Sequence, residues 1–198
     1  MDKRVKDIDW RVREEVAEQG HPEDLDILVH DAYWLVRVAV AEHGRDEDLD
    51  VLVHDEDESV RNVVTLNGRD KDLDILVYDE SEYVRGAVAR QGRDGDLDIL
   101  VNDDEFTVRE AVAEHGRDKD LDVLVYDESE YVRGAVARQG RAKDIVTLVN
   151  DKSEYVRSIA LKVRQMVAEG LRKGLAEEQA EDLRKHEVDL TSAYPKMK

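Results

Sequence analysis

The chain has 198 residues, a formal net charge of −19 and 41% hydrophobic residues. It contains no cysteine, which excludes disulfides, zinc fingers and iron–sulfur ligation by thiolates. The N-terminus lacks the apolar core of a signal peptide, and no segment approaches the roughly 20 apolar residues that span a bilayer, so we expect a soluble cytoplasmic protein without membrane contact.

An internal repeat of 24 residues begins near the N-terminus. The dipeptide Val-Arg recurs with this spacing and without insertion from Val12-Arg13 to Val156-Arg157, and glycine keeps the same step from Gly20 to Gly140. Residues 68–93 reappear as residues 116–141 with a single change, so a block of two repeats has been duplicated. Self-similarity at this period predicts a solenoid of stacked units.

Each repeat contains two helical segments. In the third copy the longer segment begins near Asp79, because Asp79 and Glu82 have the spacing of a capping box, and it ends at Gly92, which can adopt the left-handed conformation. The shorter segment, residues 72–77, spans barely two turns and is compatible with an α-helix or a 3₁₀ helix. We therefore predict an all-α fold, a right-handed superhelix of two-helix repeats. The same capping pair recurs at Asp55/Glu58, Asp127/Glu130 and Asp151/Glu154.

The repeat resembles the leucine-rich variant repeat. The matching residues are Val-Arg-Gly-Ala-Val-Ala-Arg-Gln-Gly at 84–92, followed by Asp-Leu-Asp-Ile-Leu-Val-Asn-Asp at 96–103, and the resemblance covers roughly residues 10–160. It implies a unit that pairs an α-helix with a short 3₁₀ helix, similar to HEAT repeats but shorter. Some members of that family carry an iron–sulfur module, which this cysteine-free chain cannot hold.

The repeat pattern changes after Val156. Residues 153–187 predict one or two longer helices, with apolar residues at helical spacing. Solenoids need such a segment to cover their last apolar face. We expect a repeat domain of six to seven repeats at residues 1–157, followed by capping helices and a tail at residues 158–198.

The regularly spaced arginines could grip phosphates or carboxylates, but a structural role is favoured. Charges beside a core are tolerated when they are paired and hydrogen-bonded, and an aspartate column repeats with the same period. We predict an Arg/Asp ladder between neighbouring repeats. Its aspartates are Asp31, Asp55, Asp79, Asp103, Asp127 and Asp151.

Neither a metal site nor a catalytic site is predicted. Asp94, Asp96 and Asp98 resemble the start of an EF-hand loop, but Ile99 stands where that loop needs glycine, so an acidic rim facing solvent is favoured. No nucleophile motif or glycine-rich phosphate loop occurs. We expect no cofactor and no enzymatic activity.

Some polar and aromatic columns change identity from repeat to repeat while their neighbours stay constant. Constant positions hold the stack, whereas varying ones are free to meet a partner. Packing of tyrosine and tryptophan between repeats is the alternative for the aromatic residues. The candidate partner-binding residues are Trp10, His30, Trp34, His54, Tyr78, Tyr83, Asn102, Phe106, Tyr126 and Tyr131.

The negative charge lies in the repeats, because residues 152–198 carry ten Lys and Arg against eight Asp and Glu, which leaves 20 against 41 for residues 1–151. Such a field repels duplex phosphates and attracts basic partners. The leading hypothesis is a non-enzymatic scaffold whose acidic surface binds a basic protein or peptide. The alternative is a nucleic-acid mimic that occupies the DNA- or RNA-binding groove of a defence or regulatory protein. A base-modifying enzyme of HEAT-like form would need a basic face.

Overall fold

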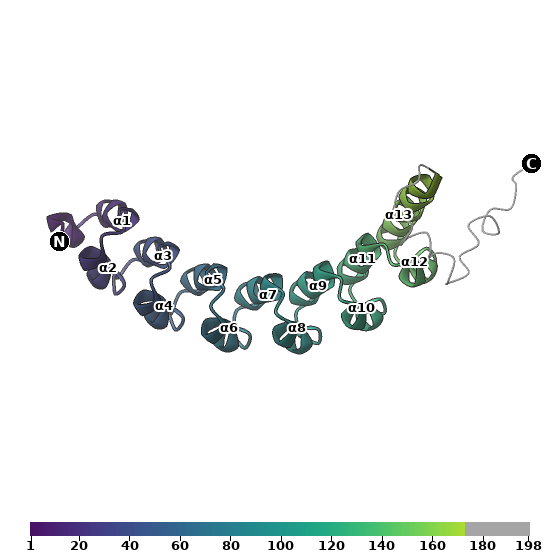
Figure 1. The fold of residues 1–198 in the computed structure, drawn as a ribbon, viewed down its shortest axis with the longest axis horizontal. Helices are drawn as coiled ribbons and strands as arrows, with labels where there is room; N and C mark the ends of the chain where they lie inside the picture. The colour runs from purple at the N-terminus through teal and green to yellow at the C-terminus, as the bar shows by residue number, and fades with distance from the viewer. Residues whose placement is uncertain (173–198) are drawn as a thin grey trace, which may run out of the picture. The chain divides into compact units, whose positions relative to one another are not determined.

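The computed structural model describes residues 1–172, which form helices and no strand (Figure 1). The 3₁₀ helix η1 (Lys3–Lys6) comes first. The long helices are α1 (Trp10–Glu18), α3 (Trp34–Glu42), α5 (Glu58–Leu66), α7 (Glu82–Gln91), α9 (Phe106–His115), α11 (Glu130–Gln139) and α13 (Glu154–Arg172). The short helices are α2 (Pro22–Leu28), α4 (Asp46–Leu52), α6 (Asp70–Leu76), α8 (Asp94–Leu100), α10 (Asp118–Leu124) and α12 (Ala142–Leu148).

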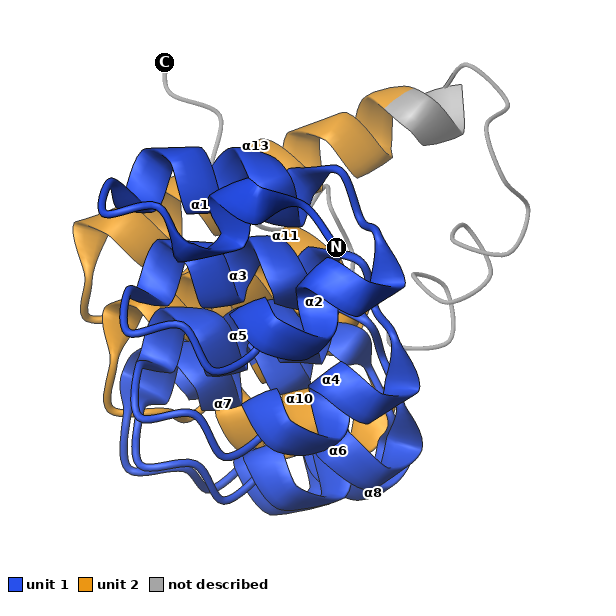
Figure 2. Cartoon of the chain, turned by 90° about the vertical axis from the view of Figure 1, so that its left-hand side faces the viewer, with its two compact units in different colours: residues 1–111 blue, residues 112–198 orange. Residues whose placement is uncertain are grey.

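The chain divides into two compact units, residues 1–111 and residues 112–198 (Figure 2). In the first unit α1, α3, α5 and α7 pack side by side in one layer, and α2, α4 and α6 each contact the long helix before and after them. In the second unit α11 packs against α13, and α10 and α12 flank α11. The predicted fold of two-helix repeats is therefore confirmed.

The expected domain boundary between residues 157 and 158 lies inside α13. This placement does not test the separate capping role of the C-terminal region, which stays a prediction. Residues 173–198, which include residues 173–187 of the longer helical segment expected at 153–187, lie outside the described residues.

The short segments are α-helices of seven residues, which settles the alternative left open by the sequence and differs from the 3₁₀ helix implied by the resemblance. In α6 the N–H of Val77 bonds to the carbonyl of Leu73 at 3.0 Å, the spacing of an α-helical turn. The helix begins at Asp70, two residues earlier than expected, so two turns suffice for α geometry.

The predicted capping boxes are wrong. Helix α7 begins at Glu82 with Ser81 at its N-cap, and Asp79 lies two residues further upstream. The Asp79 carboxylate instead accepts the Ser81 N–H at 2.8 Å and binds an arginine of the preceding repeat. A bidentate, charge-assisted bond to arginine is stronger than a helix cap, so this aspartate orients the turn before the helix.

The repeated glycines end the long helices as predicted. Gly92 follows α7 with φ 76°, a left-handed conformation that glycine adopts without steric cost. The side chain before several of these glycines reaches back to the preceding long helix. Asn67 Nδ2 donates to Ala41 O at 3.2 Å, and His43 Nε2 lies 2.7 Å from Ala17 O. This column therefore ties neighbouring helix ends together.

The core lies between the long and short helices of each unit. Paired leucines of the short helices, such as Leu73 and Leu76, are 1% exposed, and Val84 and Val88 of α7 are fully buried. The small Val and Ala side chains of the long helices allow close packing at about 8–10 Å between axes. Over residues 1–172, no helix combines the length and apolar character needed to cross a membrane.

Candidate binding groove between repeats

The predicted Arg/Asp ladder is present within each unit. Arg61 of α5 donates from Nε and Nη2 to the two carboxylate oxygens of Asp79 at 2.7 and 2.8 Å, and from Nη1 to the carbonyl of Asp55 at 2.7 Å. The hydrogen bond to Asp79 raises the pKa of the buried Arg61 guanidinium above its ordinary value, against the opposite effect of burial. The same pairing joins Arg13 to Asp31, Arg37 to Asp55, Arg85 to Asp103, and Arg133 to Asp151.

A second ladder, which the sequence reasoning missed, joins the short helices. Arg69 donates to both carboxylate oxygens of buried Asp72 at 2.6 and 2.8 Å, and to the carbonyl of Asp46 in the preceding repeat at 2.9 Å. The signal in the sequence is an arginine directly after each repeated glycine from Gly44 to Gly140, always three residues before an aspartate. Equivalent pairs are Arg45/Asp48, Arg93/Asp96, Arg117/Asp120 and Arg141/Asp144.

The first repeat has His21 where the others have this arginine. Its buried Asp24 instead accepts a hydrogen bond of 2.7 Å from the backbone N–H of Asp2, just before η1. The segment around η1 thus supplies the donor that the first repeat lacks.

Burial and ion pairing act in opposite directions on the ladder aspartates. Burial alone would raise the pKa of Asp103, but the hydrogen bonds from Arg85 and from the Glu105 N–H outweigh it and hold that pKa below its ordinary value. For Asp144 burial prevails over the Arg141 bond, so the pKa is raised. The balance between desolvation and ion pairing therefore differs between Asp103 and Asp144.

The aspartates that resembled an EF-hand loop all lie in α8, where Asp96 is bound to Arg93. No group of three or more His, Cys, Asp or Glu side chains suited to a metal ion occurs in the described part of the chain.

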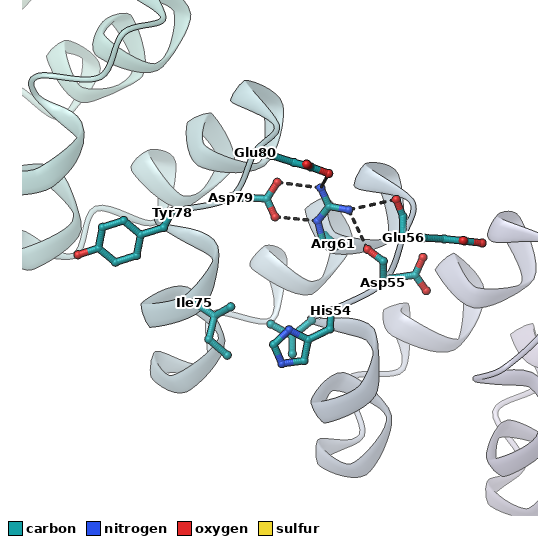
Figure 3. A pocket seen from close by; sticks show the side chains of 9 residues that line it. His54, Asp55, Glu56, Arg61, Ile75, Tyr78, Asp79 and Glu80 are labelled. Carbon is teal, nitrogen blue, oxygen red and sulfur yellow. Dashed lines mark hydrogen bonds and ion pairs between the residues drawn. The ribbon is translucent and has the colours of Figure 1, made fainter.

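A groove of about 450 Å³ opens in the first unit between the turn that follows α4 and the turn that follows α6 (Figure 3). Arg61 and Asp79 form one wall, and Ile75 of α6 lies opposite them. The His54 ring points toward Ile75, whereas the Tyr78 ring lies at the margin and points away from His54. The remaining lining residues are Val53, Asp55, Glu56 and Glu80.

The charges that are open to a ligand at this groove are negative. The Glu56 and Glu80 side chains are 88% and 89% exposed, and their nearest arginine nitrogens lie 3.8 and 3.7 Å away. By contrast, Arg61 is 8% exposed and is saturated by Asp79 and by backbone carbonyls. The groove therefore combines an aliphatic floor with a carboxylate rim, which suits a cation on an apolar stem.

The structure brings two of the predicted site residues together, His54 and Tyr78, which line the groove. His30 and Asn102 occupy the equivalent exposed turns of the first unit, and Tyr126 occupies such a turn in the second unit. The turn column is thus open to solvent as expected, but its members are spread along the repeats. The sequence reasoning missed Ile75, Glu56 and Glu80, because constant or ordinary surface residues gave no sign of a shared groove.

The aromatic residues of the long helices lie outside this groove. Trp10 is half-buried, stacked on Tyr33 with ring centroids 4.3 Å apart, and covered on its ring by Arg11 at 4.7 Å. This geometry matches the packing alternative for the aromatic column. Trp34 is also half-buried. Tyr83, Phe106 and Tyr131 are exposed, and Tyr131 lies 5.9 Å from Tyr155 between ring centroids.

Similar proteins are found by structure and not by sequence. Neither a protein-family model nor a curated protein matches the chain. A solved leucine-rich repeat variant, described as having a novel repetitive structural motif, superposes with a TM-score of 0.71 and 29% identity over 80% of this chain and 68% of that one. The resemblance to leucine-rich variant repeats is confirmed.

A second solved structure, the Escherichia coli protein YibA, superposes with a TM-score of 0.51 and 18% identity. The match covers 92% of this chain and 88% of YibA. At this identity the likeness concerns the fold alone. The likeness to the leucine-rich repeat variant agrees with an architecture of helical repeats. In this chain the long and the short helices of neighbouring repeats are joined by two Arg/Asp ladders.

Proposed function

We propose that this leucine-rich variant repeat protein is a non-enzymatic scaffold of the cytoplasm that binds a basic segment of a partner protein. The observation that carries the proposal is the groove between the turns after α4 and α6, where exposed Glu56 and Glu80 lie at the rim across from Ile75 (Figure 3). An arginine or lysine side chain would place its methylenes against Ile75 and turn its charge toward the rim carboxylates.

The positive charge of the buried Arg61 is not expected to repel a cationic ligand. Arg61 is neutralised by Asp79, to which it makes two short bonds, and its remaining donors are turned to backbone carbonyls. The Tyr78 ring, 72% exposed at the margin, offers a face on which a second cation can rest. Desolvation of the incoming cation is limited, because the groove stays open to water at its rim.

The groove is tested with a fluorescein-labelled nonapeptide of alternating arginine and glycine, measured by fluorescence anisotropy. The double variant Glu56→Gln/Glu80→Gln is expected to weaken binding roughly tenfold, since each exposed ion pair contributes about 0.2–1 kcal/mol. The matched control is Glu15→Gln/Glu114→Gln, at exposed positions of α1 and α9 outside the groove, which changes the net charge equally. If both double variants weaken binding to the same extent, attraction is diffuse and the groove is not the site.

A nucleic-acid mimic is the second candidate, favoured by carboxylates that recur on the short helices at the repeat spacing. The Asp46 and Asp70 side chains are 80% and 85% exposed. Each is bonded to an arginine of the next repeat, however, which reduces the charge it presents. A pull-down from lysate at rising salt separates the candidates. Release of a captured nucleic-acid-binding protein by duplex DNA, unaffected by Glu56→Gln/Glu80→Gln, would favour mimicry over the groove.

A further inference from the structure

Apolar side chains face outward on two neighbouring long helices of the first unit. On α3 the residues turned away from the core include Leu35 and Val38, both half-buried, and on α5 they include Leu66, which is 70% exposed. Helices α3 and α5 pack directly against each other and lie side by side in Figure 2. We call Leu35, Val38 and Leu66 the long-helix patch.

The other repeats show that the fold does not need these apolar residues. The position of Leu66 is occupied by Glu18, Glu42 and Arg90 in the other long helices of the first unit. The position of Val38 is occupied there by glutamate, asparagine or glycine. Because all these helices adopt the same structure, the apolar choice in the second and third repeats requires a different explanation, and exposed apolar patches mark interaction sites.

The charge beside the patch indicates the chemistry of its occupant. Glu18 and Glu42 are exposed in the last turns of α1 and α3, on the side of the patch away from α7. The C-terminal ends of these helices add the negative pole of their dipoles to the two carboxylates. An occupant that combines apolar and basic groups satisfies both features.

We infer that the long-helix patch docks a basic amphipathic helix of a partner protein. Neighbouring helix axes lie about 8–10 Å apart, and residues i and i+7 of a helix are separated by about 10.5 Å along its axis. Val38 is the repeat equivalent of Asn62, one turn before Leu66, so the two positions are offset by about 6 Å along the axes as well as by one helix spacing. A leucine at i and another at i+7 therefore match Leu66 and Val38, with Leu35 one turn further along α3 and with lysines on the flank meeting Glu18 and Glu42. This surface lies on the long helices and is separate from the groove lined by the turns.

The test uses an 18-residue synthetic peptide of leucine and lysine whose leucines follow the helical period, with binding measured by isothermal titration calorimetry. Leu66→Glu introduces the residue of Glu18 and Glu42 and is expected to weaken binding at least tenfold, although it adds attraction for lysine. Val38→Glu should have the same effect. The matched control is Ile8→Glu, which removes another aliphatic side chain, 99% exposed, before the opposite end of α1.

Two outcomes would overturn the inference. In one, Leu66→Glu binds the peptide as tightly as Ile8→Glu, so apolar contact at the patch contributes nothing. In the other, a peptide of the same composition with scrambled leucines binds equally well, so only charge is recognised. The variant Glu56→Gln/Glu80→Gln should leave the leucine–lysine peptide unaffected, which separates failure of this surface from failure of the groove.

Discussion

Arg61 illustrates how a charged residue becomes part of the repeat's framework. A guanidinium has five N–H donors in a fixed plane, and here those on Nε and Nη2 meet the Asp79 carboxylate while Nη1 meets the carbonyls of Asp55 and Glu56. The side chain thereby fixes both the next repeat and the turn before its own helix. Lysine, with one point charge, could not hold both sets of acceptors in this geometry.

Removing the carboxylate should therefore be costly. Asp79→Ala leaves the Arg61 charge buried without its counter-ion, and we expect the free energy of unfolding to fall by about 3–5 kcal/mol in urea titrations followed by circular dichroism. The neighbouring Glu80→Ala changes a side chain that is 89% exposed and should stay within about 0.5 kcal/mol of the parent. Similar losses for the two variants would contradict a structural ladder.

For single residues, the sequence predicts the Arg/Asp ion pairs better than it predicts the residues of a binding site. The first ladder could be predicted because its two columns share one period and both would otherwise be unpaired charges. The second ladder could not be predicted in this way, because Asp72 within Asp-Leu-Asp has the sequence context of a solvent-exposed acidic residue. The structure shows that Asp72 is buried and bound to Arg69. Side chains that vary, such as His54 and Tyr78, could be singled out, but the groove between them depends on how far apart two turns lie.

Among the elements, the duplicated helices α7 and α11 form an internal comparison. Both have the sequence Glu-Tyr-Val-Arg-Gly-Ala-Val-Ala-Arg-Gln, yet their glycines have different surroundings. A Cβ on Gly86 would meet only the flexible end of Arg90, at 3.6 Å, whereas a Cβ on Gly134 would lie 2.8 Å from Cε1 of Tyr155. The same local sequence therefore has room for a larger side chain at Gly86 but not at Gly134 unless the Tyr155 ring moves.

We predict that alanine stabilises the protein more at Gly86 than at Gly134. Gly86→Ala should raise the free energy of unfolding by about 0.5–1 kcal/mol, because glycine is unfavourable within a helix. Gly134→Ala should gain less or lose stability, because the Tyr155 ring must move. Thermal unfolding of each variant and of the double variant checks this, and an equal gain at both sites would show that the ring shifts without cost.

Helix boundaries were predicted less well than helix positions. The glycines fixed the ends of the long helices correctly, because a left-handed residue has few alternatives to glycine. The predicted starts of the long helices are wrong, because aspartate is a common N-cap residue but the Asp79 carboxylate binds Arg61. The capping motif is visible in the local sequence, whereas the arginine that competes for this carboxylate belongs to the preceding repeat.

For the whole molecule, a one-dimensional array predicts that length can change by complete periods. Deleting residues 68–91 would join Asn67 to Gly92 and present Asp103 to Arg61 in place of Asp79, so the ladder is preserved. We expect a folded, shorter protein that still unfolds cooperatively in urea. Its free energy of unfolding should fall less steeply with urea concentration, because a shorter chain exposes less surface on unfolding.

The matched control deletes half a period, residues 68–79, which removes Asp79 from the first ladder and both Arg69 and Asp72 from the second. This variant should lose its cooperative transition. Equal behaviour of the two deletions would argue against stacking in register. The period of the fold can be predicted from the sequence, because every column repeats with the same spacing. The partner cannot, because recognition depends on the few positions that depart from the pattern.

The backward-reaching arginines have a consequence for synthesis on the ribosome. Arg93 bonds to the carbonyl of Asp70 at 3.0 Å, so α6 receives its last hydrogen bonds only after the following repeat has emerged. At about 5–20 residues per second, that wait is on the order of a few seconds for each repeat. The nascent chain therefore carries a moving, unfinished edge, at which leucines are exposed, Asp70 still lacks Arg93 and Arg85 still lacks Asp103. Exposed apolar surface of this kind favours aggregation during synthesis.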